Sequence, residues 1–226
     1  MLNWMRWLPE NVSTFGGDID AIIRAIWYVT VAWFFLTFGV LGAFLVLYRR
    51  RPGRRASYVS GEPLRQAAWV LAPVAAVLAL DLWIDVRGAP VWARVKLDRP
   101  PTEIVLEVQA RQFNWEVVHP GPDGTLGTAD DRRFLDEIHV PAGRPVRLVL
   151  KSRDVIHSFF SPHLRLKQDI VPGRTVTVWF EATRPGTYEL PCAELCGLGH
   201  SGMKGWLHVH TPEAYRQWLA EQWPPA

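Results

Sequence analysis

The chain has 226 residues, of which 49% are hydrophobic, and its formal net charge at pH 7 is +3. This length allows one domain of ordinary size with a further segment attached, or two domains. The net charge is small and the basic residues are concentrated rather than spread along the chain. The composition therefore argues against a nucleic-acid partner and calls for a local explanation of the basic residues.

Two apolar runs near the N-terminus indicate a pair of membrane-spanning helices. The run at residues 25–48 carries no charge and, at a rise of ~1.5 Å per residue, can cross the ~30 Å hydrocarbon core of a bilayer. The run at residues 67–84 includes Asp81, which we place at the membrane interface because it lies a turn from the end of the run. We expect helices at about residues 22–48 and 65–86.

A basic loop, RRRPGRR at residues 49–55, separates the two runs. By the positive-inside rule such a short loop stays on the cytoplasmic side of the membrane. Residues 1–98 are therefore predicted to form an N-terminal segment and a transmembrane hairpin in the cytoplasmic membrane, with both termini on the outer, periplasmic side. The first run lies far from Met1 and lacks a cleavage site, so it is interpreted as an anchor rather than a removable signal.

Residues 99–226 show a different pattern. Short, partly alternating segments, such as those at residues 103–110, 144–152 and 175–182, are separated by turns rich in proline and glycine. This pattern is typical of an antiparallel β-sandwich or barrel. At the end of the chain, TPEAYRQWLAEQW has an N-capping threonine, a proline suited to a first turn and helical periodicity. The sequence thus predicts an extracytoplasmic all-β domain with a short C-terminal helix.

The stretch CAELCGLGHSGM, residues 192–203, holds both cysteines of the chain. In an oxidising compartment a disulfide is the default expectation for two cysteines. However, the spacing also places Cys192, Cys196, His200 and Met203 in one loop as possible metal ligands, and a disulfide gives no reason for the last two. A thioether is a poor zinc ligand and a good copper ligand, so Met203 favours copper.

A second thiolate is one too many for a mononuclear blue-copper site, which uses one cysteine, two histidines and a weak axial methionine. Two thiolates can instead bridge two coppers, each completed by an imidazole and a weak ligand. This arrangement needs a second histidine from elsewhere in the fold. His157 follows apolar residues and is the preferred candidate, whereas His208 and His210 share one strand face and are expected to be exposed.

Several motifs together resemble one known family. The two-helix hairpin is followed by DVIHSF (154–159), KQDIVPGR (167–174) and CAELCGLGHSGMKG (192–205), in the order seen in subunit II of the haem-copper oxidases, the cytochrome c oxidase family. The resemblance covers nearly the whole chain. It implies a cupredoxin-like Greek-key sandwich that carries the dinuclear copper centre called CuA.

The resemblance also implies a ligand set and a function. The metal ligands would be His157, Cys192, the backbone carbonyl of Glu194, Cys196, His200 and Met203. The Glu194 side chain would reach a magnesium ion at the contact with subunit I. The chain would accept electrons from a cytochrome c or another small redox donor and pass them to the haems of subunit I for oxygen reduction. Because both coppers would be fully ligated, no catalytic residue is expected in this subunit.

Two positions depart from the family pattern. In the aromatic stretch where electrons enter, Phe113 stands in place of the first tryptophan, while Trp115 is retained. At the start of the second helix, Gln66 replaces the glutamate of the main proton-pumping oxidases, and an amide cannot deliver protons as a carboxylate does. A haem-copper nitric oxide reductase with a CuA subunit is therefore an alternative, and a copper-delivery or copper-sensing protein is a third possibility.

Overall fold

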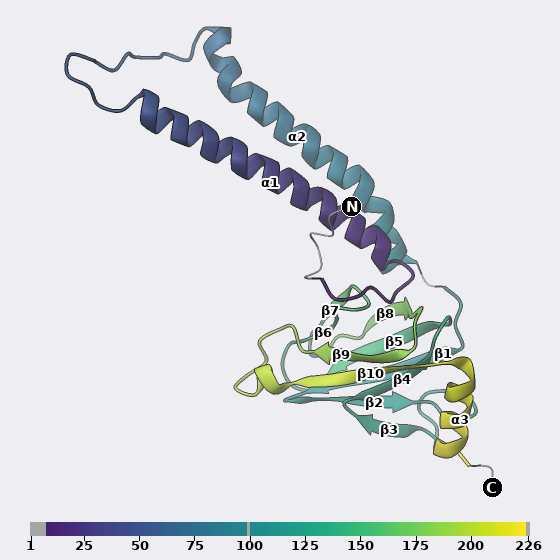
Figure 1. Ribbon diagram of the computed structural model, residues 1–226. Coiled ribbons are helices and arrows are strands. Elements are labelled where there is room, and N and C mark those ends of the chain that lie inside the picture. The colour runs from purple at the N-terminus through teal and green to yellow at the C-terminus, as the bar shows by residue number, and fades with distance from the viewer. Residues whose placement is uncertain (1–7, 99, 225–226) are drawn as a thin grey trace. The chain divides into compact units, whose positions relative to one another are not determined.

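The computed structural model describes residues 8–98 and 100–224. The prediction that both chain termini lie on the outer side of the membrane concerns residues outside these ranges. Within the described ranges, the chain forms two compact units (Figure 1). One contains residues 20–92 and is helical. The other combines residues 8–19 with residues 93–224 and is mainly β-structure. Each unit is described separately below.

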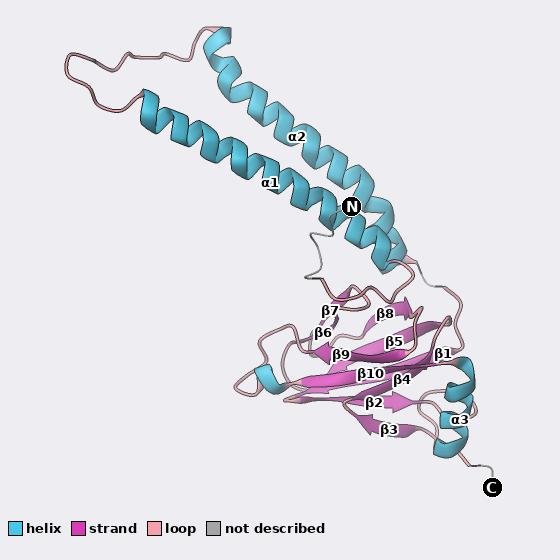
Figure 2. Cartoon of the chain, in the orientation of Figure 1, coloured by secondary structure: helices cyan, strands magenta, loops and turns pink. Residues whose placement is uncertain are grey.

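The helical unit contains most of α1 (Gly16–Leu47) and α2 (Leu64–Trp92), which Figure 2 shows in cyan. Both helices are long and apolar enough to cross a membrane. Their apolar side chains, such as Phe35 and Leu45, are exposed to the surroundings rather than packed in a protein core. Such surfaces are unfavourable in water and suit the hydrocarbon of a bilayer.

Both helices extend beyond the expected ranges. α1 begins at Gly16, where the Ser13 hydroxyl accepts a hydrogen bond from the Gly16 N–H at 3.0 Å and so satisfies a donor of the first turn. α2 continues past the apolar run to Trp92 and leads into the π-helical turn η1 (Ala93–Leu97). Hydropathy marks the part of a helix that suits a membrane and not the points where its backbone hydrogen bonds begin and end.

Residues 8–19, which the sequence groups with the hairpin, pack instead on the β-structure. Val12 and Phe15 are fully buried, and the Phe15 ring lies edge-on to Trp179 with 5.5 Å between ring centroids. The Val12 N–H donates to the carbonyl of His163 at 2.9 Å. Burial of these two apolar side chains attaches the segment to the β-domain, so the boundary at residue 98 does not separate two self-contained packing units.

The β-unit contains two main sheets and a smaller one. The strands are β1 (Ile104–Arg111), β2 (Asn114–His119), β3 (Arg132–Leu135), β4 (Glu137–Pro141), β5 (Pro145–Ser152), β6 (His157–Ser161), β7 (Leu166–Ile170), β8 (Val176–Glu181), β9 (Gly186–Pro191) and β10 (Lys204–His210). Their spatial orders are β3-β2-β1-β5-β8, β4-β10-β9 and β6-β7. The predicted arrangement of two apolar helices followed by an all-β sandwich is confirmed.

Strand direction differs in part from the antiparallel expectation. β1 pairs with β5 in parallel, and β10 pairs with β4 in parallel, while the other pairings are antiparallel. Parallel neighbours need a crossover connection, and the chain makes these crossovers between its sheets. An alternating pattern within one strand shows which face is buried, but it contains no information about the direction of the neighbouring strand.

The core lies between the sheets and is built from alternate residues of each strand. In β5, Val146, Leu148 and Leu150 are buried, and in β10 Leu207 and Val209 are buried. The intervening side chains point to the opposite face of each sheet. This alternation fixes which residues can reach the core and which can reach a surface site.

A short helix, α3 (Pro212–Gln222), ends the described part of the domain. The Thr211 hydroxyl accepts a hydrogen bond from the Ala214 N–H at 3.2 Å, and Pro212 occupies the first turn, as the sequence predicts. The helix packs on β4 and β10 and buries Trp218.

Candidate metal centre

The two cysteines lie in a loop that joins β9 to β10, and the loop is closed by backbone contacts. The Cys192 N–H donates to the Met203 carbonyl at 3.0 Å, which joins the first and last residues of the loop. The Ala193 N–H donates to the Ser158 carbonyl at 3.0 Å, which attaches the loop to β6. β6 begins at His157, so its imidazole is held beside the loop.

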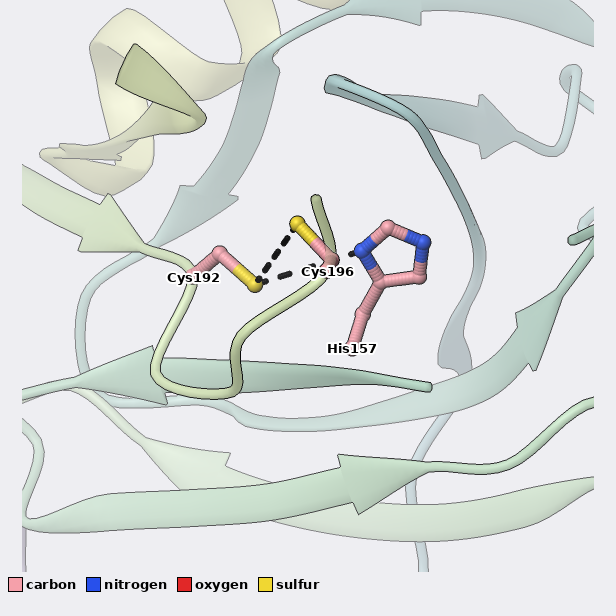
Figure 3. A group of neighbouring side chains, drawn as sticks. All are labelled: His157, Cys192 and Cys196. Carbon is pink, nitrogen blue, oxygen red and sulfur yellow. Dashed lines mark hydrogen bonds between the residues drawn. The ribbon is translucent and has the colours of Figure 1, made fainter. Parts of the chain in front are cut away.

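The two thiols face each other without being bonded. Their sulfur atoms are 4.0 Å apart, whereas a disulfide bond is ~2.05 Å long. Both cysteines are free and buried. Figure 3 shows the Cys192 and Cys196 sulfurs beside the His157 ring, with a contact of 3.9 Å between Cys192 Sγ and His157 Nδ1. The structure therefore presents two thiols and an imidazole as a group, not a crosslink.

The remaining predicted donors surround the same pair of sulfurs. Cys196 Sγ lies 3.6 Å from His200 Nδ1 and 3.7 Å from Met203 Sδ. On the other side, Cys192 Sγ lies 3.3 Å from the Glu194 carbonyl oxygen. The structure thus brings together one donor atom from each of the six predicted ligand residues. The Glu194 side chain itself is exposed, so only its backbone belongs to this group.

Asp154 determines which nitrogen of His157 faces the sulfurs. Its carboxylate Oδ1 lies 2.8 Å from His157 Nε2, and this histidine has no exposed surface. Because the Nε2–H donates to Asp154, Nδ1 keeps its lone pair for a ligand. Burial works against the charged carboxylate, but the hydrogen bond from His157 and a backbone N–H bond from Gln112 outweigh it and lower the pKa of Asp154.

The turn between β1 and β2 holds the cysteine loop in place through hydrogen bonds and a ring contact. The Gln112 N–H donates to Asp154 Oδ2 at 2.7 Å, and the Gln112 side-chain amide donates to the Cys196 carbonyl at 2.6 Å. The Phe113 ring lies directly on the loop, since a Cβ atom added to Gly199 would be 2.5 Å from Phe113 Cδ2. Sequence reasoning missed Asp154 and Gln112, although both lie within three residues of positions it singled out.

The two aromatic residues of this turn occupy different environments. Phe113 is 38% exposed and covers the loop at the surface. Trp115 is 1% exposed, and its indole N–H donates to the Leu190 carbonyl at 3.1 Å. The Trp115 ring lies edge-on to His157, with centroids 6.2 Å apart. Trp115 is therefore a core residue in contact with a predicted ligand, and Phe113 is the aromatic residue that a surface partner could reach.

The donor set suits a soft cation. Burial, together with the neighbouring Cys192 thiol, raises the pKa of Cys196 to about 11. Two thiolates at this separation therefore need a positive charge between them, which a bound metal ion supplies. Two cysteine thiolates, two imidazoles and a methionine thioether match copper better than they match zinc, because zinc sites rarely use methionine. Cys192 and Cys196 with the adjacent histidines fit a copper site.

Comparison with known proteins agrees with this donor set. The family model described as cytochrome c oxidase subunit II, periplasmic domain, matches residues 122–208. The chain is 30% identical to the alternative cytochrome c oxidase subunit 2 of Bradyrhizobium diazoefficiens, over 96% of this chain and 83% of that protein. It is 42% identical to cytochrome c oxidase subunit 2 of Synechocystis over 54% of this chain and 34% of that protein.

Among solved structures, the periplasmic domain of subunit II of cytochrome oxidase from Bradyrhizobium japonicum aligns with a TM-score of 0.48 and 25% identity. The alignment covers 54% of this chain and 95% of that domain. This score is too low to add to the sequence relationship. The relationship to the Bradyrhizobium diazoefficiens protein covers most of both chains, and we conclude that this chain belongs to the cytochrome c oxidase subunit II family and is a subunit of a haem-copper oxidoreductase complex.

Proposed function

We propose that this chain is the electron-accepting subunit of a respiratory haem-copper terminal oxidase. It takes electrons from a cytochrome c or a similar small redox donor at a dinuclear CuA centre and passes them to the haems of subunit I, where oxygen is reduced. The observation that carries the proposal is a group of six donor atoms, in which four surround two unbonded cysteine sulfurs that are 4.0 Å apart.

The two coppers would be held by the Cys192 and Cys196 thiolates, the His157 and His200 imidazoles, the Met203 thioether and the Glu194 carbonyl. When bound, the copper pair supplies one-electron exchange between the donor and the haems. The protein supplies buried donors and, through Asp154 and Gln112, a fixed ligand geometry, which keeps structural change on electron transfer small.

Electrons are proposed to arrive at the surface next to the copper loop. Phe113 is partly exposed and lies on that loop, and Leu195 and Leu198 are exposed on either side of Cys196. Trp115 contacts the His157 ring and has almost no exposed surface, so we assign it to the part of the electron path that lies inside the domain. The exposed Glu194 carboxylate is proposed to bind a magnesium ion together with subunit I.

The two apolar helices and the periplasmic-domain match fit a membrane protein with a domain on the outer side. We further propose the topology with two spans in the cytoplasmic membrane, the basic loop at residues 49–55 inside and the β-domain at residues 99–226 outside. Subunit I is the partner within the membrane. The arrangement places the copper loop on the side from which a soluble donor arrives.

Oxygen is the favoured terminal acceptor. The relatives reported above are named as cytochrome c oxidase subunits, and neither is named as a nitric oxide reductase. Phe113 and Gln66 therefore do not by themselves justify the nitric oxide alternative. A copper-delivery protein is disfavoured because such proteins use open, exchangeable sites, whereas this loop and β6 together offer a complete set of donors.

The purified complex with its large subunit tests the proposal. We expect rapid oxygen consumption with a reduced cytochrome c and an electron paramagnetic resonance spectrum in which one unpaired electron is shared by two copper nuclei. Cys196→Ser should abolish the shared signal. Turnover of nitric oxide without oxygen consumption would reject the oxidase assignment, and a spectrum of one isolated copper would reject the dinuclear centre.

A further inference from the structure

A second group of metal-binding side chains lies on the sheet β4-β10-β9. Glu137 and His139 on β4 and His208 on β10 each offer one ligand atom, and these atoms lie within 4.8 Å of one another. The three residues alternate with the buried Ile138 and Leu207, so they are on the face of the sheet opposite to the core. We propose that these three side chains form a binding site for a divalent metal ion of the zinc type.

The backbone already places the two imidazoles side by side. His139 and His208 are direct partners in the parallel pairing of β4 and β10. Their rings are stacked, with centroids 4.6 Å apart and an angle of 18° between the ring planes. Because paired strands fix the separation of their side chains, an ion could bind through side-chain rotation that tilts the two stacked rings toward each other, with no change of the backbone.

The carboxylate has a separation from His139 that suits one shared ion. Glu137 Oε2 lies 3.4 Å from His139 Nε2. Two ligand atoms that are each ~2.0–2.1 Å from a tetrahedral zinc ion lie roughly 3.3 Å apart. The Glu137 side chain is about half exposed and can adjust its position toward His208.

The hydrogen bonds of His208 leave one nitrogen available. His208 Nδ1 lies 3.2 Å from the Thr187 hydroxyl on the neighbouring strand β9. Its Nε2 is buried and has no hydrogen-bond partner among the described residues. A buried polar atom without a partner lowers the stability of the folded state. A metal ion on Nε2 would remove this cost, with Nδ1–H donating to Thr187 as ligating histidines usually do.

His139 shows the same division between its two nitrogens. Its Nδ1 lies 2.9 Å from His210 Nε2, while its Nε2 faces Glu137. The ring is also stacked on Trp218 of α3, with centroids 4.5 Å apart and planes 10° apart. His210 and Trp218 therefore act as positioning residues that hold the His139 ring and leave Nε2 directed toward the shared point.

The ligand types identify the class of ion. Two imidazoles and one carboxylate are a frequent set for zinc, with water in the fourth position. Calcium and magnesium prefer sites made only of oxygen atoms, so this set selects against them. Cu²⁺ should compete for the site, because nitrogen ligands bind it more tightly than they bind Zn²⁺.

The same residues could instead serve only to attach α3 to the sheet by ring stacking. The two explanations differ in what Glu137 does, since its carboxylate is not part of the stack. Glu137→Gln should leave the folding stability nearly unchanged and lower zinc affinity by at least about tenfold, the minimum loss typical for groups that only support a ligand. His208→Gln should reduce zinc affinity at least as much.

Glu189 provides a matched control. It is an exposed carboxylate on β9, and both it and Glu137 are register partners of Trp206, so the two lie on the same face on opposite sides of β10. The full chain, purified in detergent with copper bound, would be dialysed against Zn²⁺, and bound zinc would be measured by elemental analysis. Glu189→Gln should bind zinc as the unchanged chain does.

Zinc X-ray absorption of the same sample locates the ion. We expect only nitrogen and oxygen neighbours, and a sulfur neighbour would show that zinc has entered the cysteine loop and would overturn the proposal. Zinc affinity that is equal in the unchanged chain, Glu137→Gln and His208→Gln would also overturn it, as would the absence of bound zinc at millimolar Zn²⁺. None of these three outcomes bears on the proposed electron transfer, which rests on other residues.

Discussion

Asp154→Asn is the change that most directly tests how the protein holds the copper centre. The carboxylate of Asp154 accepts three hydrogen bonds, from His157 Nε2 and the Val155 N–H to one oxygen and from the Gln112 N–H to the other. An asparagine offers one acceptor and one donor in the same space. Whichever way the amide is turned, its NH₂ group must face an N–H donor, so at least one of these bonds is lost.

The size of the effect follows from the contacts with His157 and Gln112. Loss of a group that orients a metal-bound histidine typically lowers metal affinity 10–100-fold, which corresponds to about 1.4–2.8 kcal/mol. If the amide oxygen stays on His157, the Gln112 N–H loses its acceptor, and the turn that carries Gln112 and Phe113 keeps only the bond from the Gln112 side chain to the Cys196 carbonyl. If the oxygen turns to Gln112, His157 loses the acceptor that fixes its tautomer. Either result weakens the copper centre without removing a ligand.

The assay is competition for copper between the full chain and a chelator, followed by the electron paramagnetic resonance spectrum of the copper that remains. We expect the dinuclear signal to persist with reduced occupancy. Asp123→Asn is the control, because Asp123 accepts a backbone hydrogen bond from Thr125 at 2.8 Å in an exposed loop outside the centre. Unchanged copper retention in Asp154→Asn would refute the claim that this carboxylate orients His157.

Three further results are expected. Gly199→Ala places a Cβ 2.5 Å from the Phe113 ring and should lower the free energy of unfolding by about 1–3 kcal/mol, measured by chemical unfolding. Gly202→Ala is the control, because a Cβ at Gly202 has no atom within 4 Å and should leave the stability unchanged. Met203→Leu should retain both coppers and shift their redox potential, measured by spectroscopic titration, since a weak thioether ligand changes the redox potential of copper more than its binding affinity. Loss of copper from this variant would contradict the expectation. Burial disfavours the charged form of Glu107, but hydrogen bonds from Lys151 and Gln109 outweigh it and lower its pKa from 4.5. The resulting stability, on the order of 1 kcal/mol after solvent screening, is present above pH 4.5 and is lost as the pH falls through the lower folded-state value. Glu107→Gln should remove that part of the acid dependence of the unfolding free energy, and an unchanged pH profile would show that the pair contributes nothing.

The part of the site that could be predicted from the sequence is the local part. Cys192, Cys196, His200 and Met203 are close in the chain, so a single loop can bring them together, and the choice among metals needs only their chemistry. His157 comes from another part of the chain, where its apolar setting made it the preferred candidate and the family resemblance assigned it as a ligand. For these residues, the ligand type and the spacing in the sequence are enough to predict that the side chains can lie around one metal site.

The supporting residues could not be predicted in the same way. Gln112 acts through hydrogen bonds to Asp154 and Cys196, which are distant from it in the chain, and Asp154 bonds His157 three residues further on. Their residue types do not distinguish them from other polar loop residues. Likewise, the burial of Val12 and the parallel pairing of β4 with β10 depend on which surfaces meet after folding. The expected exposed pair, His208 and His210, is half-buried, because α3 and Thr187 lie against the same face.

The hydrogen bond between the Cys192 N–H and the Met203 carbonyl has a consequence for how the metal is bound. It joins the two ends of the ligand loop through the backbone, so the conformational entropy of closing the loop is lost when the domain folds. A loop left open until metal arrived would subtract that entropy from the affinity for copper. This chain instead presents a preorganised set of donors, in which most of the free energy of the metal–sulfur bonds appears as binding affinity.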